Sequence, residues 1–345
     1  MIQIFSPTIR RKEMDSVLTC MVDEKIGPGE INEKFVSEIK AFSDCAGAVI
    51  FRNATTALNR ALKALLIPEG SSIALSALCP RWQKIAVEEA GFVPIFADID
   101  ENTACISAKT LSSCVENGAK AIIVSEPFGQ IPEDIEDIVS LGIPVIEDIS
   151  ESAGGTLNEK KAGSFGSFAI WGFEANDIIT TGGGAALCFP EKQKWEAFLP
   201  LFRKTLKSDI LADLNCALGL TALKEWRKNE EIRRSIATVY RCAILQSRRH
   251  KIFSRATDND FSVCSFPIVI SDGVKEVLSF LDRKEIGSKL AFSDTAIADI
   301  AEDENTVENL SVATSLFSRT ILVPLYPRLR SQQIETISKV LAALP

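Results

Sequence analysis

The chain has 345 residues, enough for one large domain or two medium-sized ones, and its composition of 46% hydrophobic and 24% charged residues is that of a globular protein rather than a disordered or fibrous one. The 38 Lys and Arg residues against 46 Asp and Glu residues give a net charge of −8, which argues against a general nucleic-acid binder. The single histidine, His250, excludes a metal site or proton relay that needs two histidines.

The nine cysteines contain no C-x-x-C pair, and most of them lie in apolar stretches, so we expect reduced thiols in the core and a cytoplasmic protein. The first residues show no basic segment ahead of an apolar run, so we expect no signal peptide. No apolar segment approaches the roughly 20 residues that cross a bilayer, so we expect no membrane partner.

Short apolar runs predict the strands of a mostly parallel seven-stranded sheet, because strands covered on both faces read as continuous rather than alternating hydrophobic segments. These runs are residues 48–51, 72–75, 94–97, 121–124, 144–147, 168–171 and 185–189. Helical patterns lie between several of them, at residues 55–66, 82–90, 108–116 and 133–140. Strands that alternate with helices indicate an α/β fold with right-handed crossovers.

From about residue 192 the pattern changes. We expect one long helix over residues 209–249, one strand at 263–270 and a closing helix at 331–344. The chain is therefore predicted to consist of an N-terminal arm (1–30), a large α/β domain (31–205) and a part (206–345) that holds the long helix and a small α+β domain.

Several segments, taken together in their order and spacing, resemble the DegT/DnrJ/StrS family of nucleotide-sugar aminotransferases. They are residues 53–58 (NATTAL), 90–100 (AGFVPIFADID), 145–148 (VIED), 161–166 (KAGSFG), 178–184 (IITTGGG), 213–220 (DLNCALGL) and 323–327 (VPLYP). The resemblance implies the fold-type-I architecture of enzymes that use pyridoxal 5′-phosphate (PLP), a homodimer with active sites at the subunit interface, and a setting in polysaccharide or deoxysugar biosynthesis.

The resemblance also implies where the essential lysine of such an enzyme belongs, and that position is Asp177. An amine forms the Schiff base with the cofactor aldehyde, and a carboxylate cannot replace it. No lysine occurs between Lys161 and Lys192. Asp177 is either a polar residue that caps the turn before the glycines at 182–184 or a general acid or base.

Other cofactor-binding positions of the family are altered as well. The resemblance places Gly172 where the family has a serine that holds the cofactor phosphate, and Pro80 where an aromatic residue stacks on the pyridine ring. Trp82 is expected to pack in the core rather than to replace that ring. Glu151 corresponds to a position that is often Gln or His in the family.

Two features of the family site are retained. Asp148 ends a predicted strand and corresponds to the aspartate that pairs with the pyridine nitrogen, although a strand-end residue bonded to nearby backbone is an equally good interpretation. Asn53, Ala54 and Thr55 enter a helix, where free N–H groups and the helix dipole attract an anion such as a phosphate-bearing ligand. The simpler interpretation is an ordinary N-cap.

Three functional hypotheses follow. The first is a degenerate family member that binds a nucleotide sugar or a partner protein without transamination. The second is an enzyme that holds pyridoxamine 5′-phosphate (PMP) or PLP non-covalently, like the sugar dehydratases of the family, with Asp177 as the proton shuttle. The third is a working PLP-dependent sugar aminotransferase, which requires that the position assigned to the lysine is wrong. We expect no covalently held cofactor.

Overall fold

The computed structural model describes residues 1–254, 261–300 and 309–345, and its centre is a seven-stranded sheet. The strand order is β1-β9-β8-β5-β4-β2-β3; β9 runs antiparallel to both of its neighbours, and the other pairs are parallel. The strands are β1 (Gly47–Phe51), β2 (Ser72–Ser76), β3 (Val93–Ala97), β4 (Ala121–Ser125), β5 (Val145–Asp148), β8 (Phe168–Gly172) and β9 (Ala185–Phe189). The predicted seven strands and mostly parallel sheet are thus confirmed.

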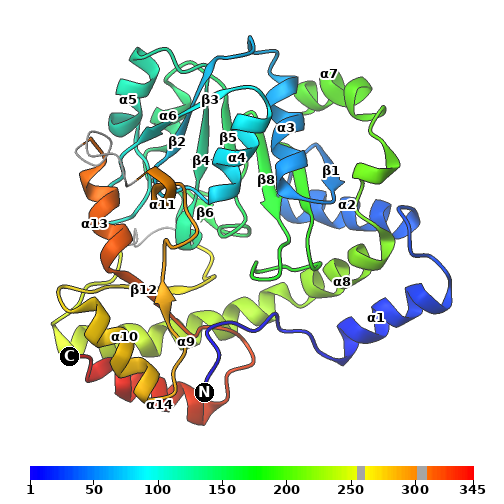
Figure 1. Cartoon of the computed structure of the whole chain (residues 1–345). Helices are drawn as coiled ribbons and strands as arrows, with labels where there is room; N and C mark the ends of the chain where they lie inside the picture. Colours follow the sequence, from blue (N-terminus) through cyan, green and yellow to red (C-terminus); the bar gives the residue numbers. More distant parts are fainter. Residues whose placement is uncertain (255–260, 301–308) are drawn as a thin grey trace.

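Helices cover both faces of this sheet (Figure 1). One face packs against α3 (Ala54–Ala64), α4 (Arg81–Glu89) and α7 (Lys192–Phe202), and the other against α2 (Glu30–Ser43), α5 (Ala108–Glu116) and α6 (Ile135–Val139). Neighbouring residues of one strand enter different cores, as Ile73 and Ala74 of β2 do. This double burial is the reason that the strands are continuously apolar in the sequence.

The predicted long helix is wrong in extent, because the chain forms two helices there. A short 3₁₀ turn (Lys207–Asp209) precedes α8 (Asp213–Lys224), and α9 (Trp226–Ser247) begins after Glu225. At the break, the Trp226 ring packs edge-on to Phe42 with 5.0 Å between ring centroids. A tertiary contact of this kind leaves no glycine or proline signal in the sequence.

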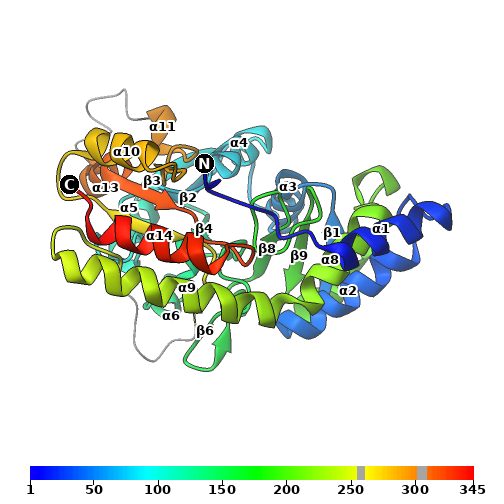
Figure 2. The same ribbon diagram turned by 90° about the horizontal axis from the view of Figure 1, so that it is seen from below.

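The C-terminal part contains a three-stranded sheet of order β10-β12-β11, where one strand was expected. The expected strand at 263–270 is shorter, β10 (Phe266–Val269), and it pairs with β12 (Thr320–Val323), which pairs in turn with β11 (Lys289–Leu290). The surrounding helices are α10 (Val274–Arg283), α11 (Ile297–Ile300), α13 (Ser311–Arg319) and α14 (Ser331–Ala342). Helix α14 lies along α9, and both pack on this small sheet (Figure 2).

The N-terminal arm forms α1 (Arg11–Val22), which packs on α8 (Figure 2). Upstream of α1, Ile2 bridges to Ile286, so the first residues run along the C-terminal part of the molecule. The two-stranded hairpin of β6 (Thr156–Leu157) and β7 (Lys160–Lys161) completes the fold. The division of the chain at residues 30 and 205 stays a prediction.

The expectation of core cysteines is wrong for one residue. Cys242 of α9 is exposed rather than part of the core, whereas seven other cysteines are buried as expected. His250, three residues beyond the end of α9, is only 7% exposed, and burial lowers the pKa of its imidazole. Within the described residues, no helix combines the length and the apolar character that a membrane crossing requires.

Candidate functional site

A cavity of about 390 Å³ lies at the edge of the large sheet where the parallel strands end, and we call it the cleft. All seven residues that the sequence singled out line it: Asn53, Ala54, Thr55, Asp148, Glu151, Gly172 and Asp177. They come from the start of α3, the ends of β5 and β8, and the loops that follow these strands. The fold therefore brings the whole predicted set to one place, while the role of each residue stays a prediction.

Helix α3 begins at the cleft with an ordinary N-cap. The side chain of Asn53 accepts a hydrogen bond of 2.7 Å from the backbone N–H of Thr56. The simpler interpretation of this residue is therefore confirmed. The N–H groups of Ala54 and Thr55 belong to the first helical turn, which has no acceptor within the helix, and they are the groups that a bound anion would use.

The carboxylate of Asp148 is the centre of a hydrogen-bond network on the cleft floor. Its Oδ2 accepts from Nε2 of Gln83 at 2.6 Å, and its Oδ1 accepts from Oγ of Ser150 at 2.5 Å. Gln83 in turn accepts from Oγ of Ser125 at 3.0 Å, and Ser150 accepts from the N–H of Gly172 at 2.9 Å. Burial raises the pKa of Asp148, and the bonds from Ser150 and Gln83 offset part of that rise.

Asp177 lies in the loop between β8 and β9, and its carboxylate is turned back onto its own loop. Oδ2 accepts a 2.6 Å hydrogen bond from the backbone N–H of Glu174. Desolvation by burial raises the pKa of Asp177 to about 7, and repulsion from Asp148, Glu151 and Glu174 adds to the rise. The side chain therefore caps the turn that begins at Glu174, whereas the sequence-based interpretation placed the cap at the turn before the glycines at 182–184.

Glu151 is held by the chain segment that follows β4. One of its carboxylate oxygens accepts a hydrogen bond from the backbone N–H of Phe128, a residue in the left-handed region with φ of 56°. Burial raises the pKa of Glu151, and Asp148 adds to the rise, whereas the ammonium group of Lys289 counteracts it. Glu151 thus ties the loop after β4 to the cleft floor.

The structure adds residues that the sequence did not single out. Gln83 is completely buried on the inner face of α4, where it reaches Asp148 and Ser125. Lys289 of β11 lines the cleft from the opposite side, and it is the only basic side chain among the described lining residues. In the sequence, Gln83 could have been found only as a polar residue on the buried face of a helix, and that face is known only from the structure.

The cleft is strongly acidic. The acidic lining residues are Glu126, Asp148, Glu151, Glu174, Asp177 and Asp294. Glu126 and Asp148 are buried, and burial raises the pKa of each; at Glu126 the neighbouring carboxyl groups of Glu147 and Asp148 add to the rise. Any ligand must therefore be compatible with several carboxyl groups that are close enough to repel each other.

Comparison with known proteins identifies the family. Residues 7–342 match the model of the DegT/DnrJ/EryC1/StrS aminotransferase family. The chain belongs to this family. It is 25% identical over 350 residues to the GDP-perosamine synthase of Escherichia coli O157:H7, an alignment that covers 96% of this chain and 95% of the relative. The predicted family and fold type are confirmed.

Solved structures of similar fold support the same architecture. The aminotransferase TlmJ of Streptoalloteichus hindustanus superposes with a TM-score of 0.90 at 20% identity over 99% of this chain and 98% of its own. Spr1654 of Streptococcus pneumoniae, in its PMP form, superposes with a TM-score of 0.87 at 17% identity over the same shares of the two chains. Spr1654 also occurs in a PLP form, so the cofactor is found among proteins with this fold.

Two features of the chain near the cleft bear on whether PLP could be held covalently there. The loop that follows β8 contains no lysine between Lys161 and Lys192. A side chain at Gly172 would require Ser150 and Asp177 to shift, because its Cβ would lie 2.8 Å from Oγ of Ser150 and 2.9 Å from Oδ2 of Asp177. A phosphate would approach the carboxyl groups of the cleft.

Pro80 and Trp82, the two residues considered for the ring-stacking position, both line the cleft. Pro80 forms the N-cap of α4 and lines the cleft, where its backbone bridges to Thr295. Trp82 packs against the core of the sheet, as predicted, and also lines the cleft. An aromatic side chain is thus present at the cleft, two residues beyond the position that the family uses.

Proposed function

We propose that this family member binds a nucleotide sugar in the cleft and does not carry out transamination through a lysine Schiff base. The observation that carries the proposal is Asp177, which occupies the position that the resemblance assigns to the lysine and caps its own loop with the 2.6 Å bond from Glu174. A carboxylate in this bond supplies neither the amine nor the space for an imine. We regard the chain as a degenerate member of the family.

The ligand class is supported by the relatives and by the shape of the cleft. The relative from Escherichia coli that aligns over nearly its full length is named a GDP-perosamine synthase, which indicates a sugar nucleotide in polysaccharide or deoxysugar biosynthesis. The cleft floor offers the Asp148 carboxylate to sugar hydroxyl groups, and the α3 N-terminus and Lys289 offer positive charge to a phosphate.

Borohydride reduction followed by peptide mapping tests the absence of a lysine Schiff base. Purified protein is titrated with PLP, reduced with borohydride and digested for peptide mapping. We expect no borohydride-fixed adduct in the cleft. A fixed adduct on Lys289, the lysine that lines the cleft, would contradict the proposal, and an adduct on the exposed Lys192 would report non-specific surface labelling.

Calorimetric titration tests the sugar nucleotide. GDP-mannose is the probe, and the variants are Asp148→Asn and Asp282→Asn, the second being an exposed control on α10. We expect Asp148→Asn to weaken binding roughly tenfold, because a charged acceptor for sugar hydroxyl groups becomes neutral. The control should bind like the natural protein. Equal affinities for the natural protein and both variants would rule out the cleft as the site.

A second function, a PMP-dependent sugar-modifying enzyme, is favoured by the proton affinity of Asp177. A carboxyl group whose pKa is raised to about 7 can accept and return a proton near neutral pH. PMP when bound would supply an electron sink, and Asp177 would hold the proton. An absorbance band that appears on adding PMP, survives borohydride and is absent with Asp148→Asn would establish this function instead.

We further propose that the chain forms a homodimer, as the family resemblance implies. Helix α1 carries a row of exposed apolar side chains, Met14, Leu18 and Met21, which are 51%, 55% and 56% exposed. These residues follow helical spacing, and an apolar row of this kind is typical of an interface. Leu18→Glu should reduce the mass measured by light scattering to that of a monomer, whereas Thr19→Glu on the same helix should not.

A further inference from the structure

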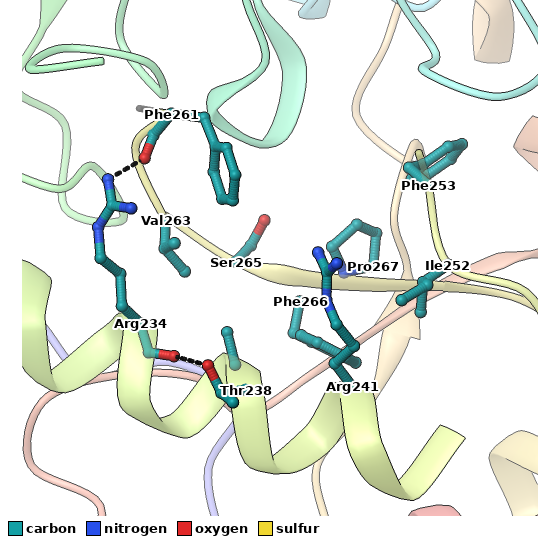
Figure 3. A pocket seen from close by; sticks show the side chains of 11 residues that line it. Arg234, Thr238, Arg241, Ile252, Phe253, Phe261, Val263, Ser265, Phe266 and Pro267 are labelled. Atoms are coloured by element: carbon teal, nitrogen blue, oxygen red, sulfur yellow. Dashed lines mark hydrogen bonds between the residues drawn. The ribbon is translucent and has the colours of Figure 1, made fainter. Parts of the chain in front are cut away.

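A second pocket lies between α9 and the chain around β10, and we call it the positive pocket (Figure 3). Its volume is about 270 Å³. Arg234 and Arg241 rise from α9 toward this space, and the opposite wall consists mainly of apolar and aromatic side chains, among them Phe253, Phe261 and Phe266. The pocket shares no lining residue with the cleft.

The lining of the positive pocket has a net charge opposite in sign to that of the whole chain. The chain carries a net charge of −8, but the two arginines are the only charged residues among the described lining residues of this pocket. Arg234 is paired with Glu230, which lies outside the lining, so the charge that the pocket offers to a ligand is that of Arg241, and the low-dielectric apolar wall strengthens its potential. The pocket therefore selects for a negative charge.

The two arginines differ in the hydrogen bonds and ion pairs that they make. Arg234 is fixed by Glu230, whose Oε1 accepts from its Nε at 3.0 Å, and by a hydrogen bond to the carbonyl of Phe261. Arg241 is exposed, and within the described part of the chain its guanidinium makes no hydrogen bond or ion pair. Its five N–H donors are available to a carboxylate or phosphate in bidentate geometry.

The aromatic wall determines the shape of the ligand. The Arg234 guanidinium lies 5.4 Å from the centre of the Phe261 ring, so the wall already combines an aromatic face with a cation. Phe253 is nearly buried, and its ring stacks on Phe128 with centroids 5.5 Å apart and planes 19° apart. A flat ring that enters the pocket buries apolar surface against these side chains without displacing a polar group.

The same stack joins the two pockets. Phe128 lines the cleft, and its backbone N–H donates to Glu151 on the cleft floor. Phe253 lines the positive pocket from the other side of the stack. The stack therefore connects the wall of the positive pocket to the residue whose N–H donates to Glu151.

We propose that the positive pocket binds a planar aromatic ring that carries one anionic group, either the carboxylate of an aromatic acid or the phosphate of a nucleotide. The ring packs on Phe253 and Phe261, and the anion pairs with Arg241. This site lies outside the cleft and does not depend on the function proposed for the cleft.

Calorimetric titration with matched probes tests the site on the full chain. The carboxylate arm compares naphthalene-2-carboxylate with its neutral carboxamide, and the phosphate arm compares adenosine monophosphate with adenosine. We expect one anion to bind at least tenfold more tightly than its neutral partner, because a charge-assisted bidentate pair is lost in the neutral compound. The arm that shows this preference identifies the source of the anion.

Two variants and one control variant test whether the probes bind in the positive pocket. Arg241→Gln should abolish the tenfold preference, and Thr238→Glu, which adds a negative charge at the pocket wall, should do the same by repulsion. Arg227→Gln is the matched control, since Arg227 is 91% exposed on the same helix outside the pocket. The proposal is overturned if neither anion binds, if each neutral compound binds equally well, or if Arg241→Gln keeps the preference.

One further comparison keeps this test separate from that of the cleft, because PLP is itself an aromatic ring with a phosphate. A non-covalent PLP signal that disappears with Arg241→Gln and persists with Asp148→Asn belongs to the positive pocket. The reverse pattern assigns PLP to the cleft, which supports the PMP-type function and leaves the positive pocket to be judged by the other probes.

Discussion

The carboxyl group of Asp177 makes folding stability depend on pH, and Asp177→Asn should remove that dependence. Its ordinary pKa of 3.8 is raised to about 7 in the folded chain, because burial disfavours the charged form. The folded state therefore holds the proton more tightly than the unfolded state. The resulting stability is complete below pH 3.8 and is lost as the pH rises to about 7.

The magnitude follows from the size of this shift. A shift of about 3 pKa units corresponds to about 4 kcal/mol, and this is an upper bound because Asp177 is partly exposed to solvent in the cleft. Nearly half of the interval between the ordinary pKa of 3.8 and the folded-state pKa of about 7 lies above pH 5.5. Between pH 5.5 and 8, the free energy of unfolding of the natural protein should fall by about 2 kcal/mol relative to Asp177→Asn, which keeps an acceptor for the Glu174 N–H.

Denaturant unfolding at pH 5.5, 6.25, 7 and 8 measures this difference. Asp282→Asn serves as the control, because it makes the same substitution at an exposed aspartate on α10, away from the cleft. A difference between the natural protein and Asp177→Asn that stays within about 0.5 kcal/mol over the whole range would refute the reasoning. It would mean that the carboxyl group is well solvated and that its proton affinity is ordinary.

Three further substitutions test the local structure by denaturant unfolding. Gly172→Ser should destabilise the fold by roughly 1–3 kcal/mol, because its Cβ would lie within 3 Å of Ser150 and Asp177, whereas Gly27→Ala, with nothing within 4 Å, should change little. Asn53→Ala should cost about 1 kcal/mol by removing the cap of α3. Asp213→Ala should cost roughly 2–4 kcal/mol, because three backbone N–H groups near the start of α2 lose their charged acceptor.

The large sheet could be predicted from sequence because its strands are short and buried on both faces. In β2, for example, Ile73 and Ala74 belong to different cores, so no polar residue lies between its buried positions. Gly70 and Pro80 lie on either side of this strand and mark its limits in the sequence. The small sheet could not be predicted in the same way. Strand β11 has only two residues, and β12 follows α13 directly, so no periodic pattern has room to develop.

The site was predictable in its positions but not in its bonds. The family resemblance identified Asp148 and Asp177, and the fold does bring them to one cleft. The hydrogen-bond partners of Asp148 could not be predicted. One of them, Gln83, lies on α4, and the buried face of this helix is defined only by its packing on the sheet. The break between α8 and α9 is a similar case, since it depends on where Trp226 finds a partner.

The charge of the cleft bears on the choice between the two proposed functions. A phosphate there meets the N-terminus of α3 and Lys289 as its positive partners, and a helix terminus contributes about 0.3–1 kcal/mol at an exposed site. Against them stand carboxyl groups such as Asp148, Glu151 and Asp177, whose pKa values are all raised. These groups repel an anion only when they are ionised, so the repulsion grows as the pH rises through about 7, the pKa of Asp177. A cofactor phosphate held in the cleft would therefore bind more weakly at pH 8 than at pH 6, whereas a ligand that meets these groups through hydroxyl hydrogens gains acceptors over the same range.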